Sequence, residues 1–136
     1  MGKKILILAA SPRRGGNSDL LCDQFKRGAE AAGHEVSIVF LREKKIGYCR
    51  ACDACRRTGS CVQQDDMAAL LDAMEAAQVI VLATPVYFYA VSAQIKTVID
   101  RTVARYTKLS GKELYYILTA ADTNQDMLAR SAEAFR

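Results

Sequence analysis

The sequence of 136 residues has no tryptophan, one histidine, and no apolar run that approaches the roughly 20 residues needed to span a membrane. Its formal net charge is only +4 and its basic residues are dispersed, so we expect neither a nucleic-acid nor a membrane partner. This charge is compatible with an anionic small molecule. The one histidine, His34, follows a glycine that we expect to end a helix, and we assign it no catalytic role.

The number of cysteines and the start of the chain indicate the cellular compartment of the protein. The start of the chain runs into a short apolar stretch without a small-residue cleavage site, which is not typical of a secretory signal. Five cysteines in such a chain favour a reducing compartment, where thiols bind a metal or stay free, over a disulfide scaffold. We therefore predict a cytoplasmic protein.

Short, continuously apolar segments predict four strands that are covered on both faces of a sheet: 4–10, 36–41, 79–83 and 114–119. Helical periods lie between them, beginning after Ser18, after Asp66, near Ile95 and near Met127. Alternating strands and helices predict an α/β fold with a parallel sheet. The length fits a single domain over residues 1–136.

No strand segment follows the fourth helical period, although a doubly wound domain with five strands would have one. Two interpretations stay open at this point. Either the chain is a C-terminally truncated fragment, or its last strand is an edge that takes a partner.

The segment 11–18, Ser-Pro-Arg-Arg-Gly-Gly-Asn-Ser, follows the first strand and opens the first helix. It matches neither the G-x-G-x-x-G fingerprint nor a Walker A loop. Its polar groups nevertheless converge at a helix N-terminus, where free backbone N–H groups and the helix dipole favour an anion. These groups belong to Ser11, Arg13, Asn17 and Ser18. The alternative interpretation is a polar turn in which Asn17 or Ser18 caps the helix.

This segment resembles the Ser-Pro-Arg-x-x-Gly-Asn-Ser element of the flavodoxin-like NAD(P)H-dependent FMN reductases, a family that includes the iron–sulfur flavoproteins. In that family the loop holds the FMN phosphate, and the resemblance gives this role to Ser11, Arg13, Asn17 and Ser18. It also implies a flavodoxin-like, doubly wound parallel sheet of order 2-1-3-4, with the fifth strand missing from this chain.

A second segment, Thr-Pro-Val-Tyr-Phe-Tyr over 84–89, resembles the part of the family that contacts the flavin ring, and the match continues to Arg101. A planar ring needs flat apolar contacts on its face. The resemblance implies that the ring is lined by Pro85, Val86, Tyr87 and Phe88. A single tyrosine here also fits packing beneath a helix. We expect Asp100 and Arg101 to make structural contacts.

The expected topology brings these segments together. In an open parallel sheet a ligand binds beyond the carboxyl ends of the strands, where the strand order reverses. The two segments follow the first and third strands, which flank that point. The loop after the fourth strand would complete the pocket, and we assign Ala121 and Asp122 to it.

Four cysteines, Cys49, Cys52, Cys55 and Cys61, share a loop over 47–62. Zinc sites usually have two cysteine pairs separated by a longer segment, whereas C-x2-C-x2-C with one further cysteine is more typical of an iron–sulfur cluster. The spacing is similar to that of the iron–sulfur flavoproteins, which implies a 4Fe–4S cluster. The arginines of the loop suit a cluster or reactive, cluster-free thiols. The separate Cys22 fits a small buried hydrophobe.

The resemblance implies an FMN-dependent oxidoreductase that takes hydride from NAD(P)H onto FMN and passes electrons to a quinone, a flavin, a metal ion or a redox protein. It also implies a homo-oligomer, either a dimer or a tetramer. One alternative is an electron carrier of the iron–sulfur flavoprotein type, which the four cysteines favour. Another is a non-enzymatic metal- or redox-sensing module. No separate adenine-binding fingerprint distinguishes NADH from NADPH.

Overall fold

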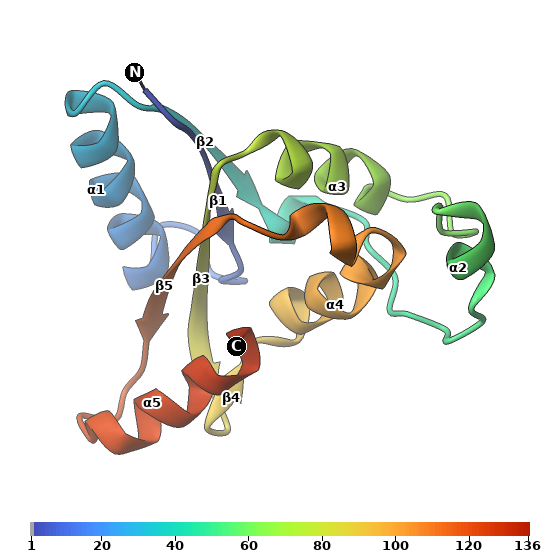
Figure 1. The fold of residues 1–136 in the computed structure, drawn as a ribbon. Helices are drawn as coiled ribbons and strands as arrows, with labels where there is room; N and C mark the ends of the chain where they lie inside the picture. Colours follow the sequence, from blue (N-terminus) through green and yellow to red (C-terminus); the bar gives the residue numbers. More distant parts are fainter. Residues whose placement is uncertain (1) are drawn as a thin grey trace.

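Four parallel strands form the centre of the structure, a computed structural model that describes residues 2–136 (Figure 1). They are β1 (Lys4–Ala9), β2 (Glu35–Phe40), β3 (Val79–Tyr87) and β5 (Glu113–Thr119). Their order is β2-β1-β3-β5, and every neighbouring pair is parallel. The predicted doubly wound sheet, with its reversal between the first and third strands, is therefore confirmed.

Helices cover both faces of this sheet (Figure 1). The α-helices are α1 (Asn17–Ala31), α2 (Ala54–Thr58), α3 (Met67–Ala76), α4 (Ala93–Arg101) and α5 (Gln125–Ala132). Short 3-10 turns are η1 (Leu41–Glu43), η2 (Thr102–Ala104), η3 (Tyr106–Leu109) and η4 (Glu133–Phe135). The α1 helix ends before Gly33, whose φ of +87° is the left-handed conformation that ends many helices. The sequence predicts this end correctly.

The strands alternate their side chains between two apolar cores, because successive residues of a strand point to opposite faces. On one face Ile5 and Ile7 pack with Val81 and the buried Cys22 of α1. On the other face the side chains of β1 and β3 pack against α3 and α4. The helical period expected after Asp66 is confirmed as α3, which buries four apolar residues on this face: Met67, Leu70, Leu71 and Met74.

The third strand is longer than the sequence predicts. It continues past Ala83 to Tyr87 and returns through the two-residue strand β4 (Ala90–Val91). The register of β1 on β3 ends at Ala83, whereas β5 continues to pair up to Pro85. Only one side of β3 is paired at Pro85, and proline is tolerated in a strand at such an edge because it has no N–H to donate.

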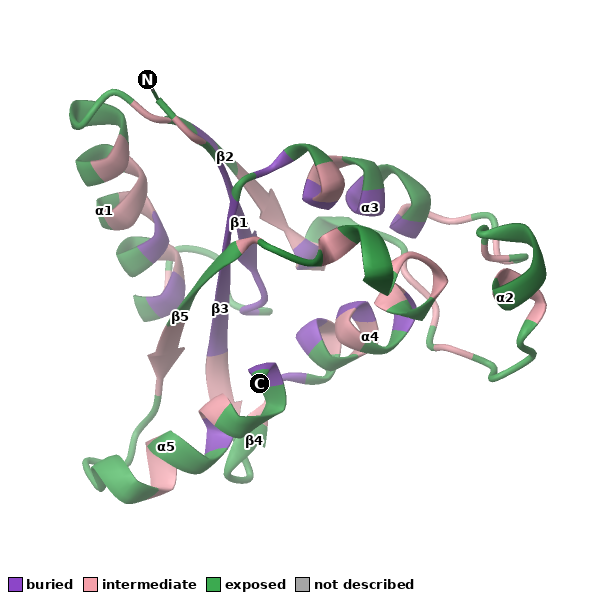
Figure 2. Cartoon of the chain, viewed as in Figure 1, coloured by how far each residue is buried: buried purple, intermediate pink, exposed green. Residues whose placement is uncertain are grey.

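The fourth parallel strand, β5, is less covered than expected. Within the described chain it pairs only with β3. Leu114 and Tyr115 are 45% and 49% exposed, so the prediction that this strand is covered on both faces is wrong. Figure 2 shows the contrast with the buried β1. No helix of residues 2–136 is both long and apolar enough to cross a membrane.

Candidate functional site

The turn from β1 into α1 leaves the backbone N–H groups of the first helical turn free. Gly15 adopts a φ of +65°, which glycine reaches without strain, and this conformation turns the chain into the helix. Helix α1 begins after Gly16, and no side chain of residues 2–136 caps this end. The N–H groups of the first helical turn are therefore available to an anion, whose charge the helix dipole also favours.

A pocket of about 350 Å³ lies at the carboxyl ends of β1, β3 and β5. It contains eight of the residues that the sequence assigns to FMN: Ser11, Arg13, Asn17, Ser18, Pro85, Val86, Tyr87 and Ala121. Three segments separated widely in sequence thus form its walls. Polar groups come from the loop before α1, and the apolar wall comes from the end of β3.

Two assigned residues, Phe88 and Asp122, do not line this pocket. The backbones of Phe88 and Tyr89 have φ values of +52° and +61°, which form the tight turn between β3 and β4. At this turn the Phe88 side chain is 98% exposed. The Asp122 carboxylate accepts a hydrogen bond from the backbone N–H of Asn124 at 2.8 Å, in the loop before α5.

Thr119, which the sequence analysis did not assign, also lines the pocket, as do Gly16 and Ala120 of the two loops expected there. Thr119 is the last residue of β5, and its hydroxyl lies 2.8 Å from the hydroxyl of the buried Ser18. This contact joins the loop before α1 to the end of β5. The only sequence signal for it is a polar residue at a strand terminus, which is too common to select one position.

The apolar wall is held by hydrogen bonds that start from the buried Ser92. Its hydroxyl donates to the carbonyl of Ala10 at 3.1 Å, and its backbone N–H donates to the Thr84 hydroxyl at 2.9 Å. The same hydroxyl caps α4. On the far side, the Ser131 hydroxyl of α5 donates to the carbonyl of Tyr89 at 3.1 Å. These bonds fix the hairpin that carries Tyr87.

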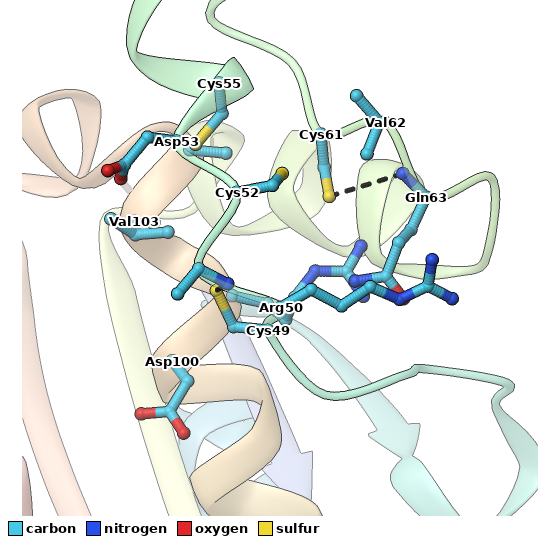
Figure 3. A pocket seen from close by; sticks show the side chains of 13 residues that line it. Cys49, Arg50, Cys52, Asp53, Cys55, Cys61, Val62, Gln63, Asp100 and Val103 are labelled. Atoms are coloured by element: carbon cyan, nitrogen blue, oxygen red, sulfur yellow. Dashed lines mark hydrogen bonds between the residues drawn. The ribbon is translucent and has the colours of Figure 1, made fainter.

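All four loop cysteines line a second pocket, of about 310 Å³ (Figure 3). They are Cys49, Cys52, Cys55 and Cys61, and none of them is in a disulfide. The four cysteines that the sequence assigns to a metal group thus line one cavity. Among residues 2–136, however, no three His, Cys, Asp or Glu side chains converge closely enough to bind one metal ion. The thiols lie on the walls of the pocket and not around one point.

Two of these sulfur atoms already accept backbone hydrogen bonds. The N–H of Gln63 donates to the sulfur of Cys61 at 3.4 Å (Figure 3), and the N–H of Ala51 donates to that of Cys49 at 3.5 Å. Hydrogen bonds of this kind stabilise negative charge on cysteine sulfur and tune bound clusters. The chemistry of the donor set, four free thiols of which two accept backbone N–H groups, is that of ligands for a thiolate-bound metal group, but the four thiols do not surround one point in this arrangement.

Arg101 fastens the base of this loop. Its guanidinium is almost fully buried and donates to both carboxylate oxygens of Asp65, at 2.8 and 3.0 Å. It also donates to the carbonyl of Gly47 at 2.7 Å, while the N–H of Gly47 donates to Asp65 at 3.0 Å. The two ends of the cysteine loop are thereby tied to α4. Asp100 pairs separately with Lys96, so both residues make the structural contacts expected of them.

This ion pair gives the protein an acid-sensitive part of its stability. The Arg101 hydrogen bonds outweigh burial and, with the N–H groups of Gly47 and Met67, lower the pKa of Asp65 from 3.8 to about 2. Because the folded-state pKa is depressed, the stabilisation is complete above about pH 5 and is lost as the pH falls toward 2. It amounts to about 2 kcal/mol.

We expect urea unfolding to show this loss. The free energy of unfolding of Asp65→Asn should lie about 2 kcal/mol or more below that of the wild type at pH 6.5, and the gap should narrow as the pH is lowered through 4. Asp23→Asn removes a carboxylate from an exposed pair with Arg27 and serves as the control, with little effect. A gap for Asp65→Asn that is constant with pH would contradict this assignment.

The strand order, the flanking helices and the position of the first pocket define a class: flavodoxin-like α/β proteins, whose ligand lies at the switch point. The model of one family, NADPH-dependent FMN reductase, matches residues 3–132. The chain therefore belongs to the NADPH-dependent FMN reductase family. FMN is the cofactor that this membership indicates, as the sequence predicts.

Curated relatives are iron–sulfur flavoproteins. One from Archaeoglobus fulgidus is 42% identical over 98 residues, which cover 72% of this chain and 44% of the relative. One from Methanosarcina thermophila is 37% identical over 100 residues, which cover 74% of this chain and 52% of the relative. The chain thus matches about half the length of these relatives.

Solved structures show the same fold. An NADH:FMN oxidoreductase in its apo form superimposes with a TM-score of 0.72 at 17% identity, covering 96% of this chain and 64% of the other. An NAD(P)H:quinone oxidoreductase from Methanothermobacter marburgensis gives a TM-score of 0.71 at 15% identity, covering 100% of this chain and 74% of the other. At these identities the similarity shows the fold alone.

Proposed function

We propose that this chain is the flavin-binding domain of an FMN-dependent oxidoreductase that takes hydride from NAD(P)H and passes electrons to a quinone, a flavin, a metal ion or a redox protein. The observation that carries the proposal is the pocket at the carboxyl ends of β1, β3 and β5. It has hydrogen-bond donors for an anion on one wall and the apolar residues Pro85, Val86 and Tyr87 on another. Bound FMN would supply the hydride-accepting N5 atom of its ring.

The residues of the chain would divide the work of binding this cofactor. Arg13, with the amide of Asn17 and the hydroxyls of Ser11 and Ser18, would hold the phosphate beside the free N–H groups of α1. The end of β3, with Pro85 to Tyr87, would orient the ring and limit solvent access to one of its faces. The protein would act by positioning and by tuning the flavin, without acid–base chemistry of its own.

A second candidate is an electron carrier of the iron–sulfur flavoprotein type, which the shared pocket of Cys49, Cys52, Cys55 and Cys61 favours. These four thiols would hold a 4Fe–4S cluster and relay single electrons to or from FMN. The sequence similarity to proteins named iron–sulfur flavoproteins supports this candidate. The free thiols also support the proposal of a reducing, cytoplasmic setting.

Anaerobic stopped-flow reduction by NADPH distinguishes the reductase from the carrier. The FMN-loaded protein should be mixed with excess NADPH, and the flavin absorbance should be followed with NADH in parallel. A reductase is expected to bleach the flavin in a step whose rate saturates with nucleotide concentration. A flavin that stays oxidised with both nucleotides, but is reduced by dithionite, would contradict the reductase and leave the carrier.

The proposed function includes association with further copies, as a dimer or a tetramer. The exposed apolar residues of β5, Leu114 and Tyr115, support this part of the proposal. Within the described chain this strand leaves one edge unpaired, and unpaired edges are surfaces for pairing with another strand. Mass measurement by light scattering would test it.

A further inference from the structure

A partly buried ion pair lies behind the loop that we assign to the FMN phosphate. It joins Asp19, in the first turn of α1, to Arg42 of the 3-10 turn after β2. The two nitrogen–oxygen distances are 2.9 and 3.0 Å, and each side chain is only 12% exposed. The guanidinium also lies over the Phe40 ring, 4.4 Å from its centroid. Neither Asp19 nor Arg42 lines the pocket itself.

Both partners of the pair hold the loop by its backbone. The carboxylate of Asp19 accepts a hydrogen bond from the N–H of Gly15 at 2.9 Å. The guanidinium of Arg42 donates to the carbonyl of Ser11 at 3.2 Å and to that of Arg13 at 3.4 Å. The pair thus contacts the loop on both sides of its turn. A bidentate guanidinium–carboxylate pair is rigid, so these contacts fix the direction of the loop N–H groups.

The pair also sets the charge behind the anion site. Burial would raise the pKa of Asp19, but the hydrogen bonds from Arg42 and Gly15 outweigh it and hold that pKa below its ordinary value, so the carboxylate is ionised. A lone carboxylate at this place would repel a phosphate. The buried Nε of Arg42 has no hydrogen-bond partner within the described chain, so the guanidinium is not fully satisfied by the loop and Asp19.

We propose that Asp19 and Arg42 are positioning residues for the cofactor phosphate: they order the loop and balance the charge behind it, and so determine how strongly the domain prefers FMN to riboflavin. The inference rests on the proposed role of the loop in binding phosphate. It extends that role to two residues that do not contact the ligand. Their charges act on the phosphate of FMN, and riboflavin, which has the same ring without the phosphate, serves as the comparison.

The test is the dissociation constant of riboflavin divided by that of FMN, each measured by quenching of flavin fluorescence at low salt. Arg42→Met leaves the carboxylate unbalanced, and the ratio should fall about tenfold. Asp19→Asn keeps an oxygen for Gly15 and leaves the guanidinium unbalanced, so the ratio should rise about threefold or more. Arg42→Lys keeps the charge and should stay near the wild-type ratio, and the double variant Asp19→Asn/Arg42→Met should return toward it.

The matched controls are Asp23→Asn and Arg27→Met, which make the same charge changes in the exposed pair on α1. Both should leave the ratio within about twofold of the wild type because solvent screens them. If the pair had only a structural role, Asp19→Asn and Arg42→Met would shift the ratio in the same direction, or would weaken the binding of FMN and riboflavin equally. Either result would overturn the inference. Wild-type protein that binds riboflavin as tightly as FMN would instead overturn the phosphate role of the loop.

Discussion

Replacing Arg13 and Asn17 together with alanine is expected to weaken FMN binding by roughly a hundredfold. The double change removes one charge-assisted hydrogen bond to the phosphate, worth about 1.5–3 kcal/mol, and one neutral hydrogen bond, worth about 1 kcal/mol. Both side chains line the wall of the pocket next to the free N–H groups of α1. Flavin content after purification and fluorescence titration with FMN would both report the loss.

The control for this experiment is the double variant Gln24→Ala/Arg27→Ala. It removes one amide and one guanidinium from α1 outside the pocket, so the number and kind of lost groups are the same. Its affinity for FMN should stay within about twofold of the wild type. Unchanged flavin content in the Arg13→Ala/Asn17→Ala variant would refute the assignment of this loop.

Replacing any one of Cys49, Cys52 or Cys55 with serine is expected to remove nearly all of the iron from protein purified without oxygen, while FMN is retained. Four thiolates complete the ligand set of a 4Fe–4S cluster, and a serine hydroxyl binds iron less tightly than a cysteine thiolate does. The thiol pocket and the flavin pocket share no lining residue, so the two cofactors should be lost independently. Iron, sulfide and flavin analysis per chain measures both.

Cys22→Ala is the control for these variants. Cys22 is a residue of α1 that is fully buried in the core, and burial raises its thiol pKa to about 11, so it is not a thiolate ligand. This variant should keep its iron. Wild-type protein that holds zinc in place of iron would contradict the cluster and favour the metal-binding module. Iron that survives the loss of Cys49, Cys52 and Cys55 would contradict this ligand set.

Local patterns in the sequence predict most of the fold and much of the candidate site. Continuous apolar runs mark the parallel strands because both faces of such strands are covered, and Gly33 marks a helix end because it reaches a positive φ. The order of the strands then brings the loop before α1 and the end of β3 to the same edge of the sheet. Eight of the ten assigned flavin residues meet there for this reason.

The remainder depends on contacts between distant segments, which no local pattern specifies. Arg42 meets Asp19, and Arg101 meets Asp65, across 23 and 36 positions of sequence. The exposed position of Phe88 follows from a tight turn without the usual Asn-Gly signal. The partial exposure of β5 follows from its position at an edge of the described sheet, where it pairs with β3 alone. Its apolar run, taken by itself, predicts a covered strand.

A crystal structure of the protein grown with excess FMN tests the central claim most directly. The phosphate is expected between Arg13, Ser18 and the N-terminus of α1, with the ring against Pro85 and Tyr87. A flavin at another place, or this end of the sheet closed by its own side chains at saturating FMN, would contradict the account of the site and leave only the fold.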